Sequence, residues 1–495
     1  MANQKPYYTS TDLIEAVKRK ISIPLSQQTF SENDILLFAN EETYLSQVPS
    51  ILLYHQEYFV FPVVVPLKEN TSRYPIPDRA IGLRMRDVMY QDQSGNLSDM
   101  TRVDAADKAF FQQSGGSTTS IHKFYIEGNE IVLLPKIEGS VFGSIVFYIF
   151  LRPNQLVANN RAAILQSIAT TPSQIKKNLL ANSTFIQINP TNTFTIPLHG
   201  FSNGNHLTFQ SSGILPAGML ADTLYYVVGS TTNTFQISST IGGPPIILTS
   251  VGTGIHTVTR TKSLKIGFKP GDLDFTTGTI TALNHDLVNN DRVLLSSDKM
   301  LPTPLAANTF YYVVGATSNT IQLSATLGGP PIVITYNGEG SHYISTDITT
   351  LTFDQVPVNI TNSSLIDFLQ TNTGHRTYNY DVQIPSNGIS GMSISFNSSD
   401  IPTSFGVNDY ICTANECIIP QIPSDLHNGL AERTSARILA SIGDAAGLAA
   451  VQQKISEIDK SQGSLLDNRA EGNPQKVLAR HSLLRYQRFT GRRRL

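Results

Sequence analysis

Residues 225–247 read YYVVGSTTNTFQISSTIGGPPII, and residues 311–333 read YYVVGATSNTIQLSATLGGPPIV. The two stretches are offset by 86 residues, and 16 of their 23 positions are identical. The same offset relates further pairs: His199 and His285, Pro216 and Pro302, and His256 and His342. A gap-free internal repeat indicates two copies of one structural unit. Short apolar-alternating runs between Gly, Pro and Asn clusters predict that each copy is a small all-β sandwich.

The N-terminal end of the chain has the pattern of two helices. Asp12-Leu-Ile-Glu15 predicts a capping box at the start of the first. Ser31, followed by Asp34, predicts the N-cap of the second. The expected apolar face of this second helix consists of Ile35, Phe38, Leu45 and Val48. Pro49 is expected to end it.

The C-terminal end also has helical periodicity. Ser424 is expected to cap one helix, Gly443 to end it, and Asp444 to cap the next. Spacings of three and four residues then define one packing face, made of Leu448, Val451, Ile455, Ile458 and Leu465.

A region with a period of two follows the N-terminal helices. Ile81, Leu83 and Met85 alternate with polar or small residues. Residues 124–134 predict a hairpin that turns at Gly128-Asn129, and residues 144–151 predict a further strand.

The sequence therefore predicts an α+β fold, with a helical core from both ends of the chain. The segments expected are N-terminal helices (1–57), a small β domain (58–162), a linker with the first sandwich (163–262), the second sandwich (263–348), a β-rich connection (349–418), C-terminal helices (419–468) and an extended arm (469–495).

Composition limits the class of protein. The formal net charge is −2 and charged residues make up 15%, below the roughly 25% of average domains. The chain as a whole therefore does not have the charge of a polyanion binder. No apolar run reaches the roughly 18 residues of a membrane span, and no secretory signal is visible at the start. We therefore expect no membrane association and a protein that is soluble and intracellular when made.

Residues that could carry catalysis or bind metal form no known motif. Cys412 and Cys417 lack the additional ligands of a zinc site, so free thiols on either side of a hairpin turn are favoured. The four repeated histidines are expected to hydrogen-bond loops rather than bind metal. The Ser173-Gln-Ile-Lys176 tetrad lacks its companion motifs. We therefore expect neither enzymatic activity nor a cofactor or metal.

The last 27 residues have a distinct charge, since residues 469–495 contain eight basic residues and one acidic residue, a net +7. Solvated disorder, nonspecific contact with nucleic acid and docking on a partner protein remain open. Apolar residues within the segment favour a protein partner. The residues expected to bind it are Arg469, Lys476, Arg480, Leu483, Leu484, Arg485, Arg488 and Phe489.

Several segments resemble the head-to-tail adaptor proteins of tailed bacteriophages. They are residues 31–42 for the second helix, 74–90, 124–135 and 145–153 for a β insertion, and 419–427 and 468–477 for the C-terminal helix entry and arm. The resemblance implies a ring, dodecameric as is usual in that family, in the head-tail neck of the virion, assembled in the host cytoplasm. Its implied partners are the portal protein, bound by the arm, and other connector or tail proteins. Genomic DNA would pass through the channel without sequence-specific binding.

The repeat resembles a β-sandwich module of phage structural proteins, on its Tyr-Tyr-Val-Val and Gly-Gly-Pro-Pro landmarks. That module also occurs in tail and fibre proteins. The alternative is therefore a tail fibre or receptor-binding protein that uses the repeats. In a connector, the repeats could serve as a collar, a decoration or a fibre attachment.

Overall fold

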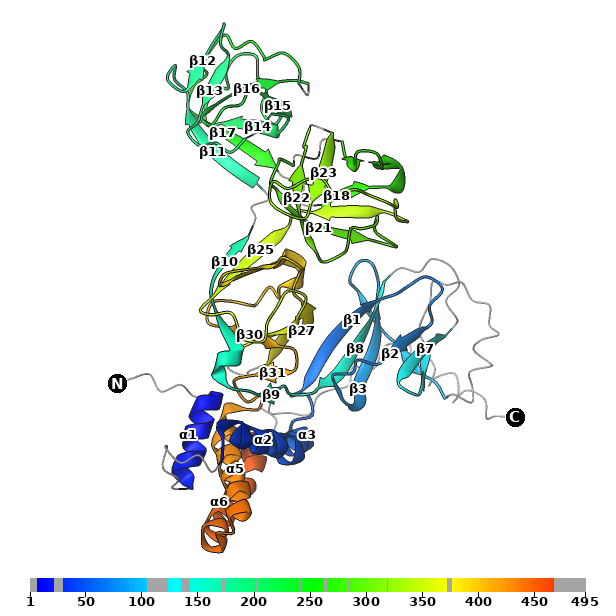
Figure 1. The fold of residues 1–495 in the computed structure, drawn as a ribbon, viewed down its shortest axis with the longest axis vertical. Coiled ribbons are helices and arrows are strands. Elements are labelled where there is room, and N and C mark those ends of the chain that lie inside the picture. Colours follow the sequence, from blue (N-terminus) through cyan, green and yellow to red (C-terminus); the bar gives the residue numbers. More distant parts are fainter. Residues whose placement is uncertain are drawn as a thin grey trace, which may run out of the picture. The chain divides into compact units, whose positions relative to one another are not determined.

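The computed structural model describes residues 7–21, 30–104, 123–134, 143–170 and 174–466, apart from 202, 241, 262–264, 284, 286, 318 and 372–375. The chain mixes helices and β-sheets (Figure 1). It divides into two compact units. The first unit comprises Met1–Ile14 and Asn154–Ser424, and the second comprises Glu15–Pro153 and Asp425–Leu495. No helix in the described part of the chain is long and apolar enough to cross a membrane.

The two repeats of the first unit have the same strand order. The first repeat forms the order β11-β17-β14-β15-β16-β13-β12, and the second forms β18-β24-β21-β22-β23-β20-β19. The strands of the first are β11 (Gln174–Leu180), β12 (Ile186–Gln187), β13 (Thr193–Thr195), β14 (His206–Ser211), β15 (Tyr225–Val228), β16 (Thr234–Ser238) and β17 (Ile255–Thr261). Those of the second are β18 (Lys265–Phe268), β19 (Leu273–Asp274), β20 (Thr279–Thr281), β21 (Arg292–Ser297), β22 (Phe310–Val314), β23 (Thr320–Ser324) and β24 (His342–Ser345), with a 3-10 turn η4 (Pro270–Asp272). Each repeat encloses its own apolar core, as the duplicated sequence predicted.

The repeated histidines hold loops, which confirms the interpretation drawn from their spacing. His199 Nδ1 accepts a hydrogen bond from the Phe201 amide at 2.9 Å, and its Nε2 lies 3.3 Å from the Thr234 carbonyl oxygen. His285 has the same two contacts at the same distances. An imidazole that accepts at one nitrogen and donates at the other is neutral, and burial lowers the pKa of His199. These histidines are therefore structural.

A third β layer completes the first unit. Its sheet has the order β27-β26-β30-β10-β25-β29-β28, over a core that includes Phe353, Phe368 and Phe396. Its strands are β10 (Ala162–Thr170), β25 (Ile348–Phe353), β26 (Leu365–Leu369), β27 (Thr377–Gln383), β28 (Ile389–Ser390), β29 (Ser393–Asn397) and β30 (Tyr410–Thr413), with a two-stranded pair of β9 (Gln155–Leu156) and β31 (Glu416–Cys417) and 3-10 turns η3 (Asn159–Arg161) and η5 (Ser398–Asp400). Strands therefore occupy the region that the sequence predicts to be β-rich, residues 349–418.

The second repeat is joined to this third layer by contacts that the first repeat cannot copy. Arg292 donates to Ser395 Oγ on β29 at 3.0 Å, and Phe310 clusters with Ile348 on β25. Within the repeat, the Arg292 guanidinium lies 3.7 Å from the centroid of the Phe310 ring. At the equivalent positions, 86 residues earlier, the first repeat has His206 and Leu224. The two copies therefore share a fold but not this docking surface.

The second unit contains two four-stranded sheets. Their orders are β1-β8-β3-β4 and β2-β7-β6-β5. Their strands are β1 (Val60–Pro66), β2 (Arg73–Pro75), β3 (Ala80–Gln91), β4 (Leu97–Asp99), β5 (Thr101–Arg102), β6 (Lys123–Glu127), β7 (Glu130–Leu134) and β8 (Ser144–Leu151). The predicted hairpin and the strand at residues 144–151 are confirmed, with Glu127 opposite Glu130 across the turn. Pro62 and Pro66 lie on the edge strand β1, where a missing N–H is tolerated.

The helices differ from the sequence prediction in four places, three of them in the N-terminal helices. They are α1 (Ser10–Lys20), α2 (Glu32–Glu42), a π-helical turn η1 (Thr43–Gln47), α3 (Val48–Tyr54), α5 (His427–Ile442) and α6 (Ala445–Leu466), with a 3-10 turn η6 (Ser424–Leu426) before α5. The first capping box pairs Thr9 with Asp12, not Asp12 with Glu15. Pro49 does not end the second helix, because it lies in the first turn of α3, where no intrahelical N–H is needed. Leu45 is 68% exposed and does not belong to the buried face.

The predicted end of α5 and the predicted cap of α6 are confirmed, but Ser424 does not cap α5. Ser424 begins the 3-10 turn η6, so the residue at the N-cap of α5 is Leu426, which makes no side-chain cap hydrogen bond. Gly443 has φ +83°, the left-handed conformation that glycine adopts without strain at the end of α5. Asp444 Oδ1 accepts from the Gly447 amide at 2.9 Å and caps α6. Along α6, Val451 is buried, and Leu448, Ile455 and Ile458 are half-buried. Leu465, the last residue of the predicted stripe, has no described side chain.

Candidate interaction site

The basic arm predicted from the sequence lies outside the described residues. This applies to Arg469, Lys476, Arg480, Leu483, Leu484, Arg485, Arg488 and Phe489. The structure describes the residues that precede it. Helix α6 ends at Leu466, which is 4% exposed. The arm therefore follows a packed residue, and the helices around α6 are the part of the candidate site that can be built.

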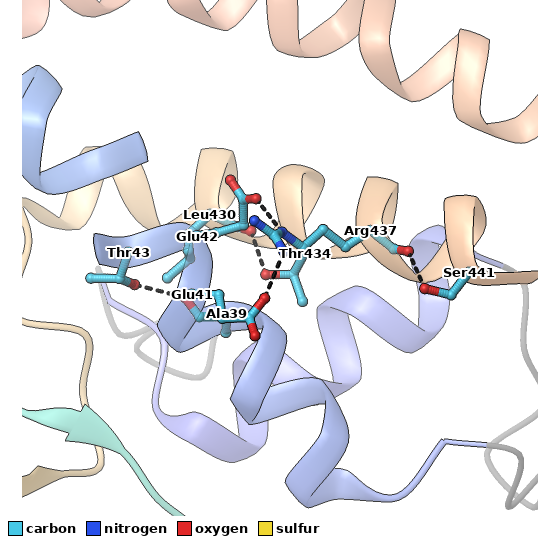
Figure 2. A network of polar contacts seen from close by, with 8 residues as sticks. All are labelled: Ala39, Glu41, Glu42, Thr43, Leu430, Thr434, Arg437 and Ser441. Atoms are coloured by element: carbon cyan, nitrogen blue, oxygen red, sulfur yellow. Dashed lines mark hydrogen bonds and ion pairs between the residues drawn. The ribbon is translucent and has the colours of Figure 1, made fainter. Parts of the chain in front are cut away.

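Helices α2 and α5 pack against each other through small residues. Ala39 and Thr43 are buried on the α2–η1 side, and Ala431, Thr434 and Ser435 on the α5 side. Their hydroxyls are satisfied within their own helices: Thr43 donates to the Ala39 carbonyl at 2.8 Å, and Thr434 to that of Leu430 at 2.8 Å (Figure 2). A hydroxyl bonded four residues back can be buried without a partner on the opposite helix. The helices can then lie close together.

An arginine fork closes this junction. Arg437 on α5 donates to Glu41 Oε2 at 2.6 Å through Nη1, and its Nε donates to Glu42 Oε1 (Figure 2). The hydrogen bond with Glu42 and the nearby carboxylates raise the pKa of Arg437 further above its ordinary value. The Glu42 side chain is only 13% exposed, so Arg437 offsets the cost of burying this carboxylate. The contact joins residues 395 positions apart in the chain.

Two further ion pairs fasten the same helices. Lys20 at the end of α1 contacts Glu432 on α5 at 2.5 Å, and the Glu432 side chain is 6% exposed. Arg433 on α5 pairs with Asp459 on α6. The helices from the two ends of the chain are therefore held by charge pairs as well as by apolar packing.

The outer face of α2, η1 and α3 carries an aligned row of residues at spacing four. We call it the outer row: Leu37, Glu41, Leu45, Pro49 and Leu53. Its three leucines are 55%, 68% and 71% exposed. A second row at the same spacing is buried: Ile35, Ala39, Thr43, Gln47 and Ile51. One helical segment thus has a buried face and an exposed row with three leucines, in which Glu41 also reaches Arg437 of α5.

The π-helical turn keeps both rows straight. Four residues of α-helix advance by about 400°, so a spacing of four drifts by about 40° at each step. The wider π-turn at Thr43–Gln47 advances by a smaller angle per residue and offsets part of this drift. Sequence reasoning missed the outer row because Leu45 was assigned to the core. The unbroken spacing of four from Leu37 to Leu53 was the signal that could have revealed it.

The two cysteines are free and fully buried on either side of the turn at Ala414-Asn415, as expected. Burial raises the pKa of both thiols, so neither is a reactive thiolate. Among the residues that the structure describes, no group of three or more His, Cys, Asp or Glu could hold a metal ion.

Replacing Arg437 with Ala should loosen the helical junction. The change leaves Glu42 mostly buried without its cation, and hydrogen bonds to charged groups contribute about 1.5–3 kcal/mol each when buried and less when exposed. We expect the free energy of unfolding to fall by about 1–2 kcal/mol, measured by urea denaturation followed by far-UV circular dichroism. Arg19→Ala is the matched control, because its pair with Glu15 is exposed. Equal losses in the two variants would contradict a structural role for the fork.

Comparison with known proteins finds no family model that matches this chain and no curated protein with a significant sequence match.

Proposed function

We propose that this chain is a structural virion protein of a tailed bacteriophage, a head-to-tail connector subunit without enzymatic activity. One observation carries the proposal most directly. Helices from both ends of the chain, α2 and α5, pack into one unit, while the repeats occupy the sequence between them. This arrangement is a helical core with inserted β modules, followed by a basic arm. It suits a platform protein in which the helices anchor the subunit and the inserted modules add further surface.

The proposed mechanism is multivalent docking on a ring. Copies of the chain form a homo-oligomeric ring, dodecameric by resemblance to adaptor proteins, in the head-tail neck. Each arm contributes residues such as Arg480, Leu484 and Phe489 to a portal subunit. When linked sites engage together, weak individual contacts give a high overall affinity. The ring extends the DNA channel and offers a platform to other connector or tail proteins.

The alternative is a tail fibre or receptor-binding protein. The observation that favours it is the pair of repeats, each with its own closed core. In that case the first repeat, which lacks the Arg292 and Phe310 docking contacts, would face a receptor. The ion-paired helical junction and the basic arm would then have no assigned role, so we favour the connector.

Electron microscopy of the full chain mixed with purified portal rings of the same virus tests the proposal. We expect an added ring of density on one end of the portal, with one copy of this chain per portal subunit by mass photometry. The connector proposal predicts this complex at micromolar concentrations. Portal rings that remain bare at that concentration, in low salt, would contradict it.

A further inference from the structure

The outer row is an apolar surface without a covering element in the described part of the chain. Leu37, Leu45 and Leu53 are more than half exposed, and the neighbouring Tyr54 is 45% exposed. Single exposed leucines are ordinary, but several aligned on one helical face mark an interaction site. The question is which partner fits it.

The size of the row favours a short segment over a folded partner. The 16 residue steps from Leu37 to Leu53 span about 24 Å at about 1.5 Å per residue. A single row of side chains presents far less area than the roughly 800 Å² that each partner of a stable complex buries. An extended chain covers about 24 Å with about seven residues. The row therefore fits a peptide-like ligand in an extended conformation.

The charge around the row favours a cationic ligand. Residues 31–58 contain five acidic residues, namely Glu32, Asp34, Glu41, Glu42 and Glu57, and no Lys or Arg. Three cations on other elements pair with this set: Lys18, Arg437 and Arg86. Five negative charges and three positive charges leave −2 on this surface. A ligand with leucine-like and basic side chains would match it.

Residues 469–495 of this chain have that chemistry. They combine a net charge of +7 with apolar pairs at Val477-Leu478 and Leu483-Leu484. The helix that precedes them, α6, packs against α3 and ends at the buried Leu466. The 11 residues from Leu466 to Val477 can reach about 36 Å when extended, which exceeds the length of the row.

We infer that residues 469–495 dock on the outer row of the same chain when no other partner holds them. A tethered ligand has a high effective concentration, so moderate contacts suffice. Any partner that binds the arm must then compete with the row. Its apparent affinity for the arm is reduced in proportion to the fraction of chains whose arm is free. The outer row thus acts as a holding site that delays arm-mediated assembly. The docking itself does not depend on the connector proposal.

Trypsin cleavage of the arm in the full chain tests the inference. Cleavage after Arg480, Arg485 and Arg488, followed by mass spectrometry, should be slower in the native chain than in a synthetic peptide of residues 469–495. The double variant Leu45→Ser/Leu53→Ser should raise the cleavage rate about tenfold, since the removal of each leucine side chain from the row weakens docking severalfold. Both side chains are exposed, so the fold should persist, which a circular dichroism melt checks.

The matched control is Leu198→Ser/Leu283→Ser, which removes two leucines that are each 74% exposed on the repeats. This control should leave the rate unchanged. Equal cleavage rates in the native chain, the row variant and the free peptide would overturn the inference. Protection that disappears on dilution would also overturn it, since the arm would then sit on a second copy.

Portal binding separates this inference from the proposed function. If the arm binds portals, the row variant should bind them several times more tightly than the native chain. Arm protection without any portal binding would uphold the inference and overturn the connector proposal. Portal binding without protection would do the reverse.

Discussion

Truncation after Asn468 should abolish binding to portal rings while the rest of the chain stays folded. The segment removed has a net charge of +7 in a chain whose total is −2. Arg480, Arg485 and Arg488 can form bidentate hydrogen bonds with carboxylates of a portal subunit. Leu483, Leu484 and Phe489 can each contribute roughly 1.5–3 kcal/mol if fully covered. Co-sedimentation of the truncated and full chains with empty portal rings measures the loss.

Salt dependence distinguishes the two kinds of contact in the arm. Replacing the three arginines with Ala should weaken portal binding mainly at low salt, because salt screens exposed charges. Replacing Leu483, Leu484 and Phe489 with Ser should weaken it at every salt concentration. If the arm binds DNA instead, only the arginine changes should matter, and the truncated chain should still sediment with portals. Sedimentation of the truncated chain with portals would contradict the arm hypothesis.

Replacing Asp367 with Ala should destabilise the first unit more than any other single change proposed for the described residues. Asp367 is fully buried on β26. Its carboxylate accepts from the Asn154 side-chain amide at 2.7 Å and from the backbone amides of Asp381 and Asn415 at 3.0 and 3.1 Å. Removing it leaves three donors without this acceptor, and a buried unsatisfied donor costs about 1–3 kcal/mol. We expect the free energy of unfolding to fall by about 3–5 kcal/mol.

The control for this variant is Asp354→Ala. Asp354 is exposed and accepts one backbone hydrogen bond, from Ile164 at 2.8 Å. Its replacement should cost under about 1 kcal/mol. Chemical denaturation of both variants measures the difference. If the two variants unfold at the same denaturant concentration, the Asp367 network is not a main support of this unit.

Features encoded over a few neighbouring residues were determined by the sequence alone. The hairpin at Gly128-Asn129, the cap at Ser31 and the left-handed Gly443 follow from the conformational preferences of the residues themselves. The repeat required no structure either, because 16 matched positions fix equivalent strands in both copies. The role of His199 and His285 followed from the same duplication.

Features that depend on residues far apart in the chain were decided only by the tertiary structure. Leu45 belongs to an apolar pattern, and only the placement of α5 shows that it faces outward. Pro49 is a helix breaker in isolation, but it fits the first turn of α3 after the π-helical turn. Arg437 and Glu42, and Asp367 and Asn154, meet across 395 and 213 residues. Local periodicity reports which side chains are apolar, whereas burial and pairing depend on which element covers them, and only the folded chain specifies that.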